Sequence, residues 1–143
     1  MSNLRLPYNE LSPELLKGFR QVKIELEKSP LGLPLIELVY MRISQINGCS
    51  YCLNLHGESL RKHDTPQRRI NELAGWRVSV QFSAKEKAAL QWTEALTHVS
   101  TTNAADAFYE PLKEHFSDVE ISDLTFAISL MNAFNRLAIG MRQ

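Results

Sequence analysis

The chain has 143 residues, 44% of them apolar and 22% charged, which is ordinary for one soluble domain with a hydrophobic core spanning residues 1–143. Sixteen basic residues balance sixteen acidic ones, and a net charge of zero argues against broad nucleic-acid binding, which needs a basic surface. The sequence contains neither an uninterrupted apolar run of membrane-spanning length nor a signal peptide, so we expect a cytoplasmic protein without a membrane anchor.

The first predicted helix covers residues 13–28. Ser12 is expected to cap it, and Pro13 suits the first helical position. Apolar side chains recur along this segment with the helical period and are expected to face the core. They are Leu15, Leu16, Phe19, Val22 and Leu26.

The second predicted helix, residues 34–46, has little polar surface and should be central to the fold. Asn47-Gly48 provides the turn chemistry that ends it. A third helix is expected from Ser50 to about His63. A short fourth helix begins at Thr65-Pro66 and stops at Gly75.

The C-terminal half begins with a capping-box pattern at Ser83–Glu86, which opens a helix to about Thr97. A helix with a break at Pro111 is predicted over 103–116. A second capping box, Ser117–Glu120, opens the last helix, which reaches about Met141. No strand alternation is visible, so the sequence predicts an all-α bundle of six or seven helices.

The two cysteines are separated by two residues, Cys49-Ser50-Tyr51-Cys52. This spacing lets both sulfurs meet within one turn, so that a disulfide can form and open without large motion. The pair lies at a predicted helix N-terminus, where free amides and the helix dipole favour the reactive thiolate. In a reducing compartment such a pair is more often catalytic or metal-binding than structural.

His56 follows Cys52 by four residues and therefore shares its helix face. Its imidazole can accept the thiol proton or return a proton to a leaving group. If the second and third helices form a hairpin around Gly48, Glu37 lies at nearly the same level as His56. A buried carboxylate there would orient the imidazole and stabilise its charged form.

Other interpretations of these residues remain open. A zinc site would need four ligands, with His63 or Glu37 completing the cysteine pair. An inert structural pair is a further alternative. Haem attachment is excluded because Leu53, not histidine, follows Cys52. Tyr40 and Tyr51 either line an approach to the dithiol or simply pack.

The spacing of Glu37, Cys49, Cys52 and His56 resembles that of the alkylhydroperoxidase D-like (AhpD-like) family within the carboxymuconolactone decarboxylase superfamily. The family pattern is Glu, eleven residues, Cys-x-x-Cys, three residues, His, and it is matched at every position. Less specific similarity extends over most of the chain beyond the first helix. It includes the stretches 75–77, 82–97 and 132–136.

The resemblance implies an all-α homo-oligomer, a trimer or hexamer, that reduces organic hydroperoxides without a bound cofactor. By position, Cys52 would attack the peroxide and become a sulfenic acid, and Cys49 would resolve it to a disulfide. His56, directly or through a water, would deprotonate Cys52, with Glu37 behind it. A dithiol donor, a lipoyl group or a thioredoxin-like protein, would restore both thiols.

Tyr51 departs from the family's best-known peroxidase, which has a histidine at the corresponding position between the cysteines. A phenol with a pKa of about 10 is a poor base at neutral pH. This favours, as an alternative, an oxidoreductase acting on protein or small-molecule disulfides. A further alternative is a non-enzymatic oligomer that senses redox state or metal. Lactone decarboxylation is not expected, because the decarboxylase branch lacks the cysteine pair.

Overall fold

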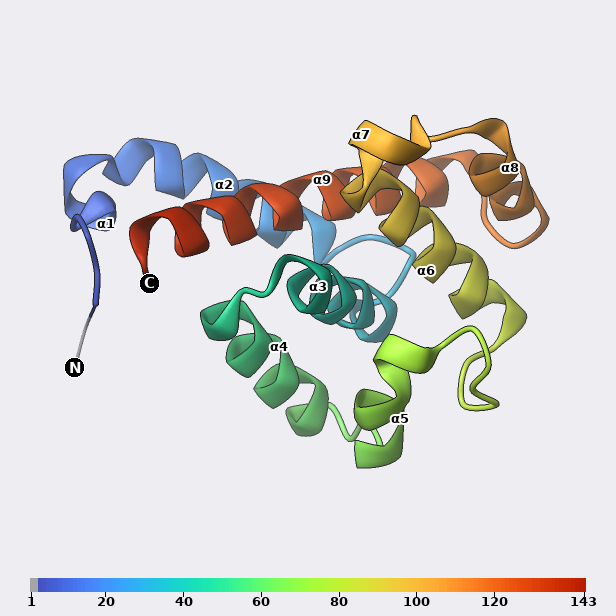
Figure 1. Cartoon of the computed structure of the whole chain (residues 1–143). Helices are drawn as coiled ribbons and strands as arrows, with labels where there is room; N and C mark the ends of the chain where they lie inside the picture. Colours follow the sequence, from blue (N-terminus) through green and yellow to red (C-terminus); the bar gives the residue numbers. More distant parts are fainter. Residues whose placement is uncertain (1–2) are drawn as a thin grey trace.

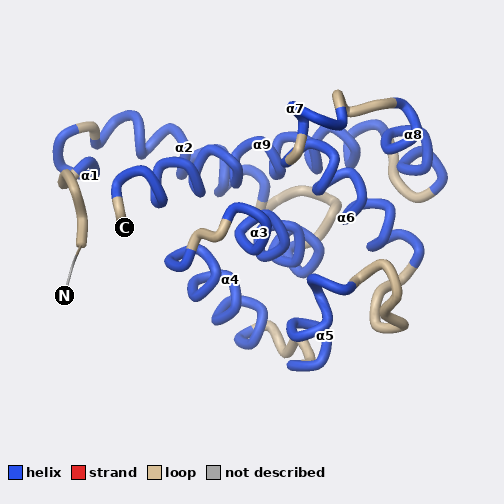
Figure 2. The backbone as a smooth tube through the Cα atoms, viewed as in Figure 1, coloured by secondary structure: helices blue, strands red, loops and turns tan. Residues whose placement is uncertain are grey.

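The computed structural model describes residues 3–143, and in this part of the chain helices are joined by loops and turns, without a strand (Figures 1 and 2). The predicted all-α class is therefore confirmed. The helices are α1 (Tyr8–Leu11), α2 (Pro13–Leu26), α3 (Leu33–Asn47), α4 (Ser50–Lys62), α5 (Gln67–Glu72), α6 (Ala84–Thr97), α7 (Val99–Thr102), α8 (Asp106–Tyr109) and α9 (Asp118–Met141), with 3-10 turns η1 (Leu73–Gly75) and η2 (Glu110–Glu114).

The main helices begin and end within about two residues of their predicted bounds. Both capping boxes are confirmed, because Ser83 and Ser117 each accept the amide of the glutamate three residues later and each glutamate returns the bond. Ser12 differs from the prediction. Pro13 occupies the first turn as expected, but the Ser12 side chain makes no capping hydrogen bond.

The predicted helix over 103–116 is confirmed only in part, because the structure is helical over 106–114 and changes helix type at Glu110, next to the break expected at Pro111. Asn103 and Ala104 adopt positive φ angles of 52° and 48°, which a right-handed helix cannot contain. The rest of the segment is divided into α8 and η2, and Pro111 lies within the first turn of η2. These short pieces and α1, which the sequence did not predict, make the helices more numerous than the six or seven expected.

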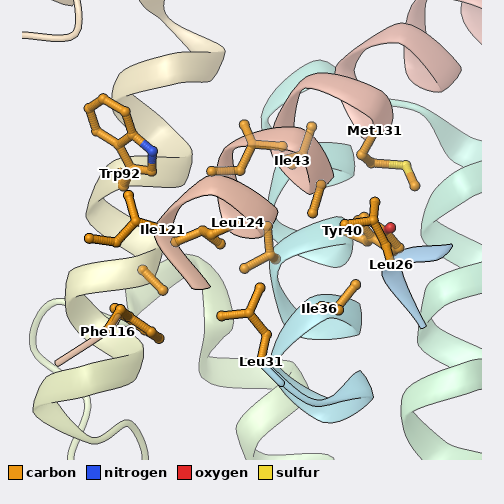
Figure 3. Packing of buried hydrophobic residues seen from close by; sticks show 14 of the residues in the cluster. Leu26, Leu31, Ile36, Tyr40, Ile43, Trp92, Phe116, Ile121, Leu124 and Met131 are labelled. Atoms are coloured by element: carbon orange, nitrogen blue, oxygen red, sulfur yellow. The ribbon is translucent and has the colours of Figure 1, made fainter. Parts of the chain in front are cut away.

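Helix α3 is the centre of the fold, as its apolar composition predicted. It packs against α4, α6 and α9 (Figure 1). Its side chains Ile36, Val39, Tyr40 and Ile43 are at most 1% exposed, and they join α6 and α9 in the main hydrophobic cluster (Figure 3). The helix is thereby held rigidly along the length that carries Glu37.

Helix α2 buries a narrower face than the sequence predicted. Leu16 and Leu26 are buried and Phe19 is half-buried, whereas Leu15 and Val22 are 74% and 38% exposed. Among the long helices α2 packs chiefly on α9, so only the side chains along one line of contact leave the solvent. The expectation that Leu15 and Val22 face the core is wrong.

Helix α9 is the one helix in the described chain that is long and apolar enough to cross a membrane by length and composition. Its contacts give a different explanation for its apolar residues. It packs against α2, α3 and α6, and Leu124, Ala127 and Ile128 are at most 1% exposed. It is therefore a core helix of this fold.

Candidate redox-active site

The turn between α3 and α4 sets the position of both cysteines. Gly48 ends α3 in the left-handed conformation, with φ at 70°, and its amide donates to the Ser44 carbonyl at 2.9 Å. Glycine adopts this conformation without steric cost. The next residue, Cys49, is the N-cap of α4.

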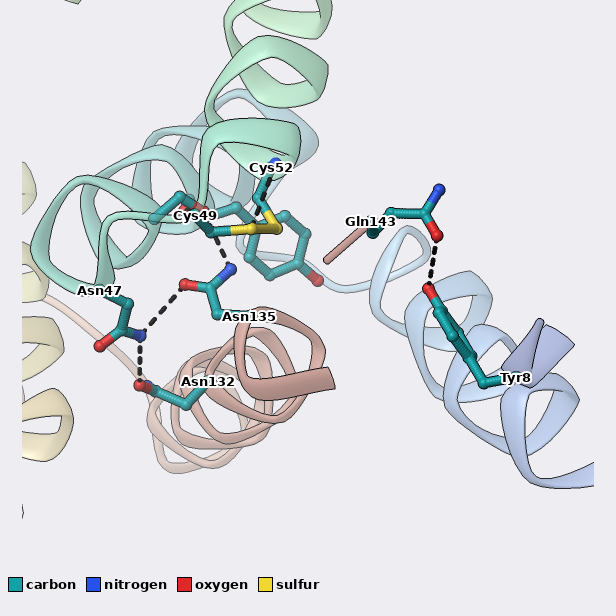
Figure 4. The surroundings of a disulfide bond; sticks show 9 residues. Tyr8, Asn47, Cys49, Cys52, Asn132, Asn135 and Gln143 are labelled. Carbon is teal, nitrogen blue, oxygen red and sulfur yellow. Dashed lines mark hydrogen bonds between the residues drawn. A yellow bond between two sulfur atoms is a disulfide. The ribbon is translucent and has the colours of Figure 1, made fainter. Parts of the chain in front are cut away.

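Cys49 and Cys52 are joined by a disulfide at the start of α4, with their Cα atoms 5.3 Å apart (Figure 4). The amide N–H of Cys52 donates to Sγ of Cys49 at 3.3 Å, so the sulfur takes the place of the usual capping oxygen. Both side chains are buried, at 1% and 4% exposed. The helix terminus thus provides a donor that favours negative charge on Cys49.

His56 and Glu37 form a buried pair across the hairpin. Nδ1 of His56 lies 2.9 Å from Oε2 of Glu37, and the residues are 2% and 6% exposed. An ionised carboxylate only accepts hydrogen bonds, so it fixes the proton of a neutral imidazole on Nδ1 and leaves Nε2 free to accept one. The structure therefore pairs Glu37 with His56 across the α3–α4 hairpin and pairs Cys49 with Cys52 at its turn.

A pocket of about 140 Å³ opens beside the disulfide, and Cys52 and His56 both line it. Cys49 does not; it lines a smaller hollow of about 80 Å³ on the other side. A small molecule that enters the larger pocket therefore meets Cys52 and the imidazole together. The remaining lining residues are Tyr8, Leu16, Arg20, Lys23, Tyr51, Leu55, Met131, Phe134, Leu137 and Ala138.

The two tyrosines weighed from the sequence have different positions. Tyr51 is 46% exposed and lines the pocket. Tyr40 is 1% exposed and packs its ring 5.2 Å from that of His56. Burial, and then the charge of Glu37, raises the pKa of Tyr40 well above its ordinary value. Its hydroxyl has no hydrogen-bond partner among the described residues, so Tyr40 fixes the imidazole by packing.

A buried amide network below the disulfide was not predicted (Figure 4). Asn47 Nδ2 donates to the side-chain oxygens of Asn132 at 3.0 Å and Asn135 at 3.1 Å, and Asn135 donates to the Ser44 hydroxyl at 3.2 Å. The network joins the end of α3 to α9, directly before Cys49. The only indication of this network in the sequence is that Asn132 and Asn135 lie three residues apart on an otherwise apolar helix.

The ligand arrangement needed for the zinc alternative is not found within residues 3–143. No three His, Cys, Asp or Glu side chains there gather closely enough to hold a metal ion. His63, which the alternative required, instead contacts the Ser59 carbonyl through Nδ1 at 2.8 Å.

Comparison with known proteins supplies the family. The family model of the carboxymuconolactone decarboxylase family matches residues 12–95. The uncharacterized protein YdfG of Bacillus subtilis is 31% identical over 137 residues, which are 96% of this chain and 93% of YdfG.

Two solved structures extend the similarity to the fold. A protein of unknown function from Agrobacterium tumefaciens, described in connection with the antioxidant defence protein AhpD, superposes with a TM-score of 0.94 at 35% identity, over 99% of this chain and 97% of that one. An uncharacterized peroxidase-related protein from Silicibacter sp. TM1040 gives 0.82 at 26% identity, over 92% and 70%. The chain belongs to the carboxymuconolactone decarboxylase family, and its structural relatives place it among the AhpD-like members.

Proposed function

We propose that this protein is a thiol-dependent peroxidase that reduces organic hydroperoxides through the Cys49–Cys52 pair. The observation that carries the proposal is the shared pocket: Cys52 and His56 line the same cavity, and Glu37 holds the imidazole from behind. The peroxidase-related and antioxidant descriptions of the structural relatives support the same role.

The first step oxidises Cys52. In the dithiol form, Nε2 of His56 accepts the thiol proton, and the sulfur attacks the terminal oxygen of the hydroperoxide. An S–O bond forms as the O–O bond breaks, so the sulfur loses the two electrons that the peroxide gains. The departing alkoxide takes the proton from His56 and leaves as an alcohol, with Cys52 as a sulfenic acid.

The second step closes the disulfide. The sulfur of Cys49 attacks the sulfur of Cys52, so that an S–S bond forms as the S–O bond of the sulfenic acid breaks. The departing hydroxide takes the thiol proton of Cys49 and leaves as water. A dithiol donor, a lipoyl group or a thioredoxin-like protein, then attacks Cys52, Cys49 leaves as a thiolate, and the donor is itself oxidised to a disulfide. Cys49 is the better leaving group, because the Cys52 amide and the α4 terminus stabilise its anion.

One observation favours a second candidate function, a disulfide oxidoreductase. Tyr51, which lies between the cysteines, is 46% exposed beside the disulfide, and a phenol is in general a much poorer proton acceptor than an imidazole. Attack on a disulfide requires only the thiolate and a stable leaving group. Such a protein would exchange thiols rapidly but react slowly with peroxides.

Assembly and compartment belong to the same proposal. We propose a homotrimer or homohexamer in the cytoplasm. Exposed apolar side chains, among them Phe126 on α9 and Val22 on α2, are 62% and 38% exposed and give an assembly apolar surface to cover. Size-exclusion chromatography with light scattering would measure the number of subunits.

A single-turnover experiment tests the peroxidase. The reduced protein is mixed with one equivalent of cumene hydroperoxide, and free thiols and product mass are followed. We expect the wild type to lose two thiols, Cys49→Ser to accumulate a sulfenic acid on Cys52, and Cys52→Ser to lose activity.

Peroxide turnover by Cys52→Ser at the wild-type rate would contradict the proposal. Rapid oxidation by a small disulfide, with no reaction with the peroxide, would replace it with the oxidoreductase. A change in oligomeric state on oxidation, without turnover of either oxidant, would instead favour the redox-sensing alternative.

A further inference from the structure

The pocket beside Cys52 has a positively charged side formed by Arg20 and Lys23, three residues apart on α2. The described residues that line the pocket include no aspartate or glutamate. Because the chain as a whole has a net charge of zero, this excess of two positive charges is a local property of the pocket.

Neither cation takes part in any ion pair within residues 3–143. Neighbouring lysines do: Lys17 pairs with Glu14 at 3.7 Å, and Lys28 pairs with Glu25 at 3.0 Å. Lys17 and Lys28 are thus paired on the protein, while Arg20 and Lys23 remain available to a ligand.

Tyr8 does not neutralise these cations. Burial, and then the neighbouring Tyr51, raises the pKa of Tyr8 above its ordinary value, although the charge of Arg20 acts in the opposite direction. Tyr8 is therefore an uncharged phenol at neutral pH. Its hydroxyl donates to the Gln143 side chain at 3.1 Å, which ties α1 to the carboxyl terminus at this pocket (Figure 4).

The remaining wall of the pocket is largely apolar, with Leu16, Met131, Phe134 and Leu137. A ligand complementary to the whole pocket has an apolar body, a group that reacts at Cys52, and an anionic end for the cations. We propose, on the basis of the peroxidase function, that the preferred substrates are organic hydroperoxides that carry a free carboxylate at their other end. Arg20 and Lys23 are then specificity-determining residues that bind this carboxylate.

The reductant is a less suitable source of the anion. A lipoyl group attached to a protein has lost its free carboxylate to the amide bond, and a thioredoxin-like protein is too large to enter the pocket. A hydroperoxy acid retains both ends, and Arg20 suits a carboxylate because guanidinium donors match its two oxygens.

The test compares a fatty-acid hydroperoxide with its methyl ester, which differs only in the charge. Steady-state kcat/KM is measured for the wild type, Arg20→Gln, Lys23→Gln and the control Lys17→Gln, which removes a paired lysine from the same helix. Contacts to a charged group of this kind, partly exposed to solvent, are expected to favour the acid over the ester by about tenfold. The ratio of kcat/KM for the acid to kcat/KM for the ester should fall toward one in Arg20→Gln and Lys23→Gln and be unchanged in Lys17→Gln. In the wild type this ratio should also fall with added salt.

Two results would overturn the proposal. One is an equal kcat/KM for acid and ester in the wild type, provided that cumene hydroperoxide is still turned over. The other is a charge preference seen only in the reductive half-reaction, for dihydrolipoate over dihydrolipoamide.

Failure of the peroxidase function itself would look different, because the wild type would reduce no hydroperoxide at all. Calorimetric binding of dodecanoate to the oxidised protein examines the cations independently of turnover. Binding should weaken in Arg20→Gln and not in Lys17→Gln, and equal affinity in both variants would count against the assignment.

Discussion

At the scale of single residues, the Glu37–His56 pair is the most sensitive contact in the site. Its Oε2–Nδ1 distance is 2.9 Å and both groups are buried. Glu37→Gln keeps the size of the side chain but removes the charge that stabilises a protonated imidazole, so we expect kcat/KM for hydroperoxide to fall by about 10- to 100-fold. Stopped-flow oxidation of the reduced protein would measure the loss.

Glu58→Gln is the matched control, because Glu58 is exposed on α4 and contacts only the amide of Asn54 among the described hydrogen bonds. It should leave the rate unchanged. Partial recovery of the rate in Glu37→Asp would separate the effect of charge from that of folding. A Glu37→Gln protein as fast as the wild type would show that the carboxylate is only structural.

Glu94 links stability to pH. Burial raises the pKa of its carboxyl, but hydrogen bonds from Trp76, Arg77 and Arg42 outweigh burial and hold the pKa below its ordinary value. A carboxyl with a depressed pKa in the folded state contributes stability at neutral pH that is lost as pH falls through the folded pKa. Glu94→Gln should therefore be less stable than the wild type at neutral pH, and the difference should shrink below pH 4.5.

Urea unfolding at several pH values checks this expectation. Glu14→Gln is the control, because Glu14 pairs only with exposed Lys17 among the described ion pairs, and the two side chains are 83% and 76% exposed. Its effect should be small at every pH. A difference for Glu94→Gln that stays constant on acidification would contradict the linkage.

The site was only partly visible in the sequence. The positions of Cys49, Cys52 and His56 follow from spacing on one helix, and Glu37 follows from the hairpin that Gly48 imposes. Arg20 and Asn135 could not be found in this way. They come from α2 and α9, and no local pattern indicates which distant helix will pack beside α4.

At the scale of elements, the contact between α3 and α9 supports the turn that carries Cys49. Asn135 is fully buried, and it accepts from Asn47 and donates to Ser44. Asn135→Ala removes both bonds and leaves buried polar groups without this partner, so we expect the free energy of unfolding to fall by about 2–3 kcal/mol. Asn54→Ala, at an exposed position on α4, should change it by less than about 0.5 kcal/mol.

Chemical denaturation of the two variants under the same conditions checks this prediction. Similar losses for both would show that the buried network contributes little beyond a surface hydrogen bond. The network was not predictable from propensity, since asparagine disfavours the interior of a helix and is retained here because its partners on α3 satisfy it.

Local signals predicted elements well where they were strong. The capping boxes at Ser83 and Ser117 gave two helix starts, and Gly48 gave the turn. The predictions were wrong where tertiary contacts determine which side chains are buried and where a helix ends. Leu15 is exposed because nothing among the described residues covers that side of α2, and the segment around Asn103 leaves the helix through positive φ angles that polar composition alone does not indicate.

At the scale of the whole molecule, the disulfide is separate from the structure that holds the fold together. The main cluster is built from α3, α6 and α9, and a second cluster surrounds Leu73 and Trp76. The cysteines belong to neither and form a small group with Ala138. The disulfide therefore lies outside both large hydrophobic clusters.

Reduction of the disulfide should consequently leave the fold intact. Cross-linking residues three apart closes a very short loop, for which chain entropy gives only about 2 kcal/mol of stabilisation. We expect urea unfolding with and without dithiothreitol to differ by no more than this, with the same far-ultraviolet circular dichroism in both states. The Cys49→Ser,Cys52→Ser double variant should match the reduced protein, since it also lacks the cross-link. A loss of helix on reduction would mean that the bond is structural, because a pair that opens in every catalytic cycle must act within a scaffold that survives its opening.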